Sequence, residues 1–85
     1  MNFPEDQLRS SYDDIISWFA PRVGRANADD LAQETFLKAW ASREHFDASR
    51  DPRPWLFGIA RNVFRRYCRD TRVYRRRFRR ESDDE

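Results

Sequence analysis

Apolar side chains recur at helical spacing in three stretches of this chain, and this pattern constrains the fold more than any other feature of the sequence. In the first stretch, residues 7–23, they lie three, four and seven positions apart on one stripe: Leu8, Tyr12, Ile15, Ile16, Phe19 and Val23. Gly24 is suited to end this helix, and Pro21 is expected to loosen its last turn. No stretch shows the alternating β-branched residues of a strand. The sequence therefore predicts an all-α fold.

The second helical stretch is predicted to follow Asn27, a good N-cap, and to reach about residue 41 with Asp29 and Asp30 in its first turn. One face is expected to pack in the core: Leu31, Ala32, Thr35, Phe36, Ala39 and Trp40. The opposite face carries Asp30, Gln33, Glu34, Leu37 and Ala41. A large apolar side chain among polar ones is either a single exposed leucine, which is ordinary, or the centre of a small protein-docking patch.

The third stretch is predicted to start at Pro54, after a loop over residues 42–53 that is rich in turn-forming residues. Its core stripe is Leu56, Ile59, Ala60, Val63, Phe64 and Tyr67, extended by Tyr74 and Phe78 if the helix continues. The opposite arc holds Gly58, Arg61, Asn62, Arg65, Arg69, Arg72 and Arg76, with Trp55 and Arg66 at its boundary. We therefore expect a three-helix domain over residues 1–74. Residues 75–85 are expected to be a frayed arginine-rich helix end with an acidic tail, or the start of an interdomain linker, because arginines four positions apart repel.

Charged residues are unevenly distributed along the chain. Residues 50–80 hold 12 arginines and two acids, whereas residues 1–49 hold five basic and nine acidic groups, so the formal net charge of +2 hides a strongly basic segment. Aromatic side chains lie within that segment. Basic residues interleaved with aromatics suit a nucleic-acid partner, because they can neutralise phosphates and stack on bases. The solvated outer face of an amphipathic helix would account for the charge equally well.

The composition does not predict an enzyme. Cys68 and His45 are each the only residue of their type, so a disulfide framework, a metal site and a nucleophilic triad all lack their parts. No apolar stretch approaches the roughly 20 residues of a membrane span, and no signal peptide is present. The sequence therefore predicts a soluble, cytoplasmic, single-domain binding protein without a cofactor, a metal or a membrane partner.

Two segments resemble the second domain of bacterial extracytoplasmic-function sigma factors. Residues 29–40, DDLAQETFLKAW, are similar to the family's DLVQETFLRAW segment. Residues 54–62, PWLFGIARN, are similar to its AWLxxIARN segment. The two occur in the family's order, with a loop of matching length between them, and the resemblance covers about residues 12–72. It implies the all-α fold of sigma region 2.

The resemblance also implies partners. Residues 29–40 would dock on the clamp helices of the largest RNA polymerase subunit, through Asp30, Gln33, Glu34 and Leu37. The last helix would melt the promoter and recognise the −10 element. There Asn62 would shape a pocket for a base flipped from the non-template strand, with Phe46 and the loop over residues 42–53 as the other wall. Trp55 would lie at the upstream edge of the melted bubble, and phosphates would be held by Arg61, Arg65, Arg66 and Arg69.

Full members of this family carry a second helix-turn-helix domain, for the −35 element. We expect this chain to be either an excised domain or a natural short form of the family. In either case we expect no independent recognition of the −35 element. An anti-sigma factor is a further partner that the resemblance allows. Two rival functions stay open. One is a basic nucleic-acid-binding module that acts without polymerase, and the other is a basic amphipathic helix that binds an acidic protein or an anionic membrane surface.

Overall fold

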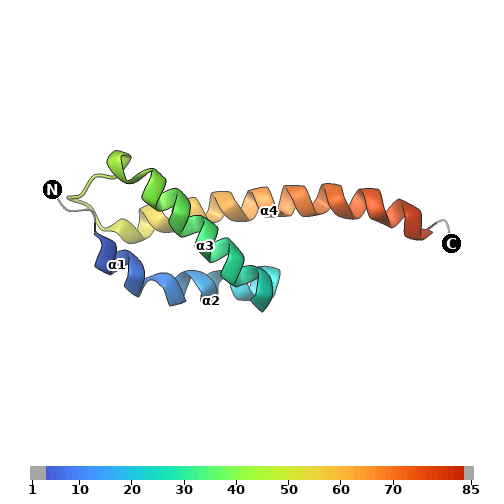
Figure 1. The fold of residues 1–85 in the computed structure, drawn as a ribbon, viewed down its shortest axis with the longest axis horizontal. Helices are drawn as coiled ribbons and strands as arrows, with labels where there is room; N and C mark the ends of the chain where they lie inside the picture. Colours follow the sequence, from blue (N-terminus) through green and yellow to red (C-terminus); the bar gives the residue numbers. More distant parts are fainter. Residues whose placement is uncertain (1–3, 84–85) are drawn as a thin grey trace.

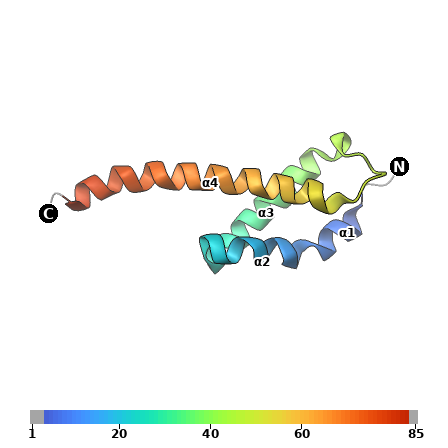
Figure 2. The same ribbon diagram turned by 180° about the vertical axis from the view of Figure 1, so that it is seen from behind.

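The computed structural model describes the backbone of residues 4–83 and the side chains of residues 4–72. Its helices, in chain order, are α1 (Glu5–Ser10), α2 (Tyr12–Val23), α3 (Arg25–Ala41), the short 3-10 helix η1 (Arg43–His45) and α4 (Pro52–Asp83). Helices α1 and α2 follow one another along one side, α3 crosses α4 obliquely, and the second half of α4 extends beyond the other helices (Figure 1; Figure 2 shows the reverse side). The predicted all-α architecture is confirmed, with the first predicted helix divided in two.

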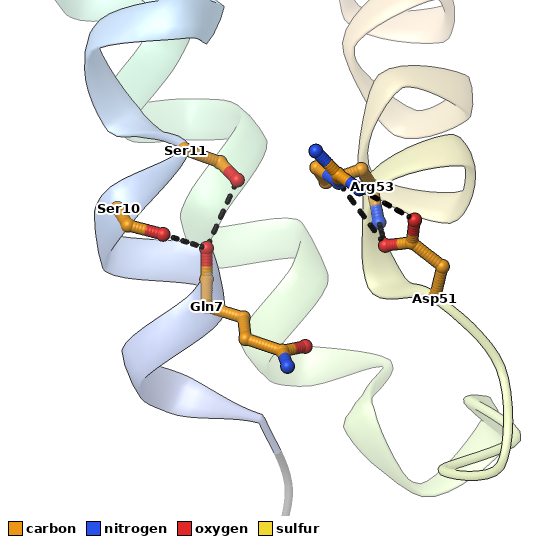
Figure 3. Close-up of polar contacts among 5 residues, drawn as sticks. All are labelled: Gln7, Ser10, Ser11, Asp51 and Arg53. Atoms are coloured by element: carbon orange, nitrogen blue, oxygen red, sulfur yellow. Dashed lines mark hydrogen bonds and ion pairs between the residues drawn. The ribbon is translucent and has the colours of Figure 1, made fainter.

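The division of the first helix falls at Ser11. The hydroxyls of Ser10 and Ser11 both donate to the Gln7 carbonyl oxygen, at 2.8 and 2.9 Å (Figure 3). The Ser11 N–H donates to the Leu8 carbonyl at 3.0 Å, three residues back, which is the tighter pattern of a 3-10 turn. Serine hydroxyls compete with the backbone for carbonyl acceptors in this way, and the prediction of one continuous helix over residues 7–23 was wrong for that reason.

Gly24 alone joins α2 to α3. Its φ of 87° lies in the left-handed region that glycine adopts without strain, so the predicted stop at this residue is confirmed. Helix α3 then begins at Arg25, and the prediction of Asn27 as its N-cap was wrong. Instead, the Asn27 amide lies within the helix and donates to the Val23 carbonyl at 2.9 Å and to the Tyr67 hydroxyl at 3.4 Å. The predicted place of Asp29 and Asp30 in the first turn was wrong as well.

Helix α4 begins two residues before the predicted Pro54. The Asp51 carboxylate accepts the Arg53 backbone N–H at 3.1 Å and the Arg53 guanidinium at 2.9 Å (Figure 3). Asp51 thus acts as the N-cap, and Pro52 takes the first helical position, where a missing N–H costs nothing. The hydrogen bonds from Arg53 hold the pKa of Asp51 below its usual value.

The buried core joins all four helices. Its members are Leu8, Ile15, Phe19, Ala28, Leu31, Ala32, Ala39, Leu56, Ala60 and Val63. Phe64 of α4 meets Trp18 of α2 edge to face, with ring centroids 5.5 Å apart. The prediction that Trp40 faces the core was wrong. Trp40 is 45% exposed and has the Arg43 guanidinium 4.1 Å from its ring centroid, because the chain turns into η1 at this end of α3.

The far half of α4 is helical to Asp83. The side chains of Tyr74, Arg76 and Phe78 lie outside the described residues, so the extension of the core stripe through them stays a prediction. The same holds for the domain boundary at residue 74 and for fraying beyond it. In the part of the chain that the structure describes, no helix is long and apolar enough to cross a membrane.

Candidate nucleic-acid and protein interface

The outer face of α3 presents an apolar side chain among polar ones. Leu37 is 70% exposed, Asp30 and Gln33 are exposed, and Glu34 is half-buried. The predicted exposure of Leu37 is confirmed. A leucine in this position contributes little to the core and leaves its apolar surface available to a partner.

Gln33 is held in place by a chain of hydrogen bonds that begins on α2. The Tyr12 hydroxyl donates to one oxygen of Asp29 at 3.0 Å, and the Gln33 amide donates to the other at 3.3 Å. Partial burial raises the pKa of Tyr12, and its bond to Asp29 adds to this rise. Asp29 therefore links the bundle to the outer face of α3.

A hollow of about 580 Å³ lies between α3 and α4 beside Leu37. Glu34, Leu37 and Lys38 line it from α3, and Arg66 and Asp70 line it from α4. Carboxylates and cations stand on both helices, so this hollow suits a partner of mixed charge, such as a protein surface.

A second hollow of about 720 Å³ lies at the Asn62 end of the same two helices. Its apolar lining is Ala41, Ile59 and Val63, and its polar lining is Lys38, Ser42, Asn62, Arg65, Arg66 and Arg69. Lys38 and Arg66 line both hollows, which places the two side by side. Glu34 and Leu37 of the predicted polymerase face therefore lie close to Asn62 of the predicted base pocket.

Asn62 is exposed and has one amide atom engaged. The Arg65 guanidinium donates to the Asn62 Oδ1 at 3.1 Å. Because a guanidinium carries only donors, it fixes the amide with its oxygen toward Arg65 and its NH₂ group turned elsewhere. Arg65, predicted as a phosphate contact, is thus also a neighbour that orients Asn62.

The remaining predicted phosphate contacts lie exposed along α4. Among the described residues, no carboxylate comes within ion-pair distance of Arg61, Arg65 or Arg66, and Arg69 approaches only the exposed Asp70, at 3.9 Å. A long, exposed ion pair of this kind contributes little. The guanidinium groups of this face are therefore available to a polyanion.

Phe46 lies apart from Asn62. Its ring packs on Trp55, with centroids 4.8 Å apart and planes at 38°, and it is not among the residues that line the Asn62 hollow. The loop is folded by Asp47, which accepts the Ser49 backbone N–H at 3.0 Å and the Ser49 hydroxyl at 2.6 Å. That hydroxyl bond in particular lowers the pKa of Asp47. Of the predicted opposite wall, only Ser42 at the start of the loop lines the same hollow as Asn62.

The rest of the opposite wall comes from the end of α3, through Lys38 and Ala41, and sequence reasoning missed both residues in this role. The available signal was their spacing. Positions 41 and 42 lie three and four residues after position 38, so all three are neighbours on the helix surface.

Comparison with known proteins now identifies the domain. The sequence profile described as sigma-70 region 2 matches residues 8–74, which is most of the chain. The chain belongs to the sigma-70 region 2 family. The resemblance to the second domain of extracytoplasmic-function sigma factors is thereby confirmed.

Relatives of this sigma region 2 domain include three bacterial proteins. The chain is 35% identical over 65 residues to the ECF RNA polymerase sigma factor SigC of Mycobacterium tuberculosis, a match that covers 76% of this chain and 35% of that protein. It is 48% identical over 42 residues to the ECF RNA polymerase sigma factor SigM of Bacillus subtilis, covering 49% and 25% respectively. It is 42% identical over 43 residues to the RNA polymerase sigma factor NccH of Alcaligenes xylosoxydans, covering 51% and 23%. The chain thus spans about a third or less of these relatives' length. No solved structure shows a significant match.

Proposed function

We propose that this sigma region 2 domain connects RNA polymerase to promoter DNA. One face binds the clamp helices of the largest polymerase subunit, through Asp30, Gln33, Glu34 and Leu37. The other recognises and melts the −10 element, with Asn62 capturing a base flipped from the non-template strand. Trp55 stacks at the edge of the melted segment, and Arg61, Arg65, Arg66 and Arg69 hold phosphates.

The adjacency of the two hollows carries this proposal. The Leu37 hollow has charges of both signs, as suits a protein partner, whereas the polar lining of the Asn62 hollow is cationic or neutral. A partner seated at Leu37 would therefore lie directly beside a strand held at Asn62, with Lys38 and Arg66 between them. This is the arrangement that a subunit coupling polymerase to an opened promoter needs.

The energetics of melting are consistent with this arrangement. Unstacking a base costs a few kcal/mol, and a protein can offset this only by binding the single strand better than the duplex. An aromatic such as Trp55 contributes about 1–3 kcal/mol per stacked base. The ring of Phe46 packs on the ring of Trp55, with centroids 4.8 Å apart. Phosphate contacts from the arginines position the strand without selecting its sequence.

Selection from a pool of randomised single-stranded DNA tests the proposal. The 85-residue chain should enrich one short motif, and it should also bind the isolated clamp helices of a bacterial RNA polymerase. Binding to duplex DNA or RNA in a separate titration, with no motif enriched from the pool, would favour the polymerase-independent nucleic-acid module. Binding to anionic vesicles that survives Asn62→Ala would favour the amphipathic-helix alternative.

A further inference from the structure

The hydroxyl of Tyr12 is not explained by packing. The ring of Tyr12 is half-buried and packs against Phe36 of α3, with centroids 5.2 Å apart and planes at 47°. A phenylalanine would fill this place equally well, without the cost of taking a hydroxyl out of water. The Tyr12 hydroxyl instead reaches across to α3 and donates to Asp29 at 3.0 Å. The hydroxyl therefore serves something other than the core.

Asp29 connects Tyr12 to Gln33, one helical turn further along α3. The Tyr12 hydroxyl takes one carboxylate oxygen, and the Gln33 Nε2 takes the other, at 3.3 Å. Among the described residues, no lysine or arginine lies within ion-pair distance of Asp29. Burial and the bond to Asp29 raise the pKa of Tyr12, whereas a hydrogen bond with the Gln33 side chain lowers it. The three side chains thus form one network that is anchored on α2.

This network fixes which end of the Gln33 amide faces a partner. An ionised carboxylate accepts and cannot donate, so the group that Gln33 turns to Asp29 is its NH₂. The amide oxygen is then turned elsewhere, on an exposed side chain one turn before Leu37. A partner on this face would therefore meet Gln33 as a hydrogen-bond acceptor that is already oriented.

The network also allows Asp29 to be covered. A partner seated beside Gln33 would take water away from the exposed Asp29 carboxylate. Covering a carboxylate is costly unless hydrogen bonds replace that water. Each oxygen of Asp29 already accepts a hydrogen bond from within the domain, so the partner need not supply a cation for it.

We propose that Tyr12, acting through Asp29, is a positioning residue of the polymerase face and holds Gln33 so that its amide oxygen accepts a hydrogen bond from the clamp helices. This inference rests on the proposed function, because it concerns the same contact face. Ordering a long side chain during binding costs affinity. The network orders Gln33 before the partner arrives, and so removes that cost.

Calorimetric titration of the isolated clamp helices with the 85-residue chain tests the inference. Tyr12→Phe removes the hydroxyl and keeps the ring, and it should weaken binding roughly two- to fivefold, the cost of ordering one long side chain. Ser10→Ala is the matched control. It also removes one hydroxyl hydrogen bond, to the Gln7 carbonyl of α1, and should leave the affinity unchanged.

Asp29→Asn tests the orientation of the amide. If the asparagine oxygen accepts from Tyr12, its NH₂ group faces Gln33 and attracts the amide oxygen. The Gln33 amide would then be turned over, with its NH₂ toward the partner. Asp29→Asn should therefore weaken binding more than Tyr12→Phe does.

The same substitutions on a Gln33→Ala background separate positioning from a structural role. Gln33→Ala alone should weaken binding about three- to tenfold, as expected for one hydrogen bond to the partner. On that background Tyr12→Phe should have no further effect, because the hydroxyl acts through Gln33. A hydroxyl that merely stabilised the bundle would weaken binding by the same factor on both backgrounds.

A measurement without the partner examines the network itself. Nitrogen relaxation of the Gln33 side-chain amide, measured by NMR, reports its motion on the picosecond to nanosecond timescale. This motion should be greater in Tyr12→Phe than in wild type or Ser10→Ala.

Four results would overturn the inference. They are an unchanged affinity of Tyr12→Phe, an equal loss from Tyr12→Phe on both backgrounds, a loss with Asp29→Asn no larger than with Tyr12→Phe, and unchanged motion of the Gln33 amide. In each case the proposed function would stand, because the wild-type chain still binds the clamp helices. If the wild-type chain does not bind them at all, the proposed function and this inference both fail.

Discussion

Leu37→Ala separates a role in partner binding from a role in the fold. Complete burial of a leucine side chain is worth about 1.5–3 kcal/mol, and at 70% exposure only roughly 0.5–0.9 kcal/mol of this acts within the domain. The slightly better helix propensity of alanine offsets part of the loss. We therefore expect Tm to fall by no more than about 5 °C. Docking would bury the remaining surface, so affinity for the clamp helices should fall by roughly 1–2 kcal/mol, or about five- to thirtyfold.

Calorimetric titration of the isolated clamp helices with each variant measures the affinity, and thermal denaturation followed by circular dichroism measures the stability. Leu56→Ala is the matched control, because Leu56 is fully buried and its truncation should cost about 2–5 kcal/mol of stability. Two results would refute the reasoning. Unfolding of Leu37→Ala to the extent of Leu56→Ala would make Leu37 a core residue, and unchanged affinity would remove it from the contact face.

Three further predictions concern α4. Replacing Arg66 and Arg69 together with glutamine should weaken binding of all single strands by similar factors and flatten the salt dependence, and a changed motif with an unchanged salt slope would show that they read bases. Gly58→Ala should raise stability by about 1 kcal/mol, because an added Cβ meets nothing within 4 Å, and a Tm that falls would contradict this. Asp51→Ala should lower Tm at neutral pH, because it removes the cap on the Arg53 N–H. The folded-state pKa of Asp51 is depressed, so its contribution to stability is present above the unfolded-state pKa of about 3.9 and is lost as pH falls through the folded-state pKa. The Tm values of wild type and variant should therefore converge in acid.

Features that depend on neighbouring residues in the sequence were largely predictable. The buried positions of α2 and the exposure of Leu37 follow from helical periodicity, and the corner at Gly24 follows from the freedom of glycine at positive φ. The break at Ser11 was missed because its apolar stripe continues across it. Only the competition of two hydroxyls for the Gln7 carbonyl reveals the break.

Features that depend on how helices cross were not predictable from periodicity. The pocket wall opposite Asn62 was assigned to Phe46 and the loop over residues 42–53. The crossing of α3 over α4 instead brings Lys38 and Ala41 there, keeps Ser42 of that loop and leaves Phe46 on Trp55. Trp40 has the spacing of a core residue but is 45% exposed at the end of α3, where the chain turns into η1. A helical wheel contains neither the crossing angle nor the place where a neighbouring helix ends.

Base capture at Asn62 is the central claim, and one pair of titrations tests it most directly. Wild type and Asn62→Ala are each titrated with the most enriched single strand and with a scrambled strand of the same composition. The account predicts that Asn62→Ala loses about 1–3 kcal/mol on the enriched strand, the cost of one specific base contact, and little on the scrambled strand. Equal losses on both strands would make Asn62 a backbone contact and contradict the account.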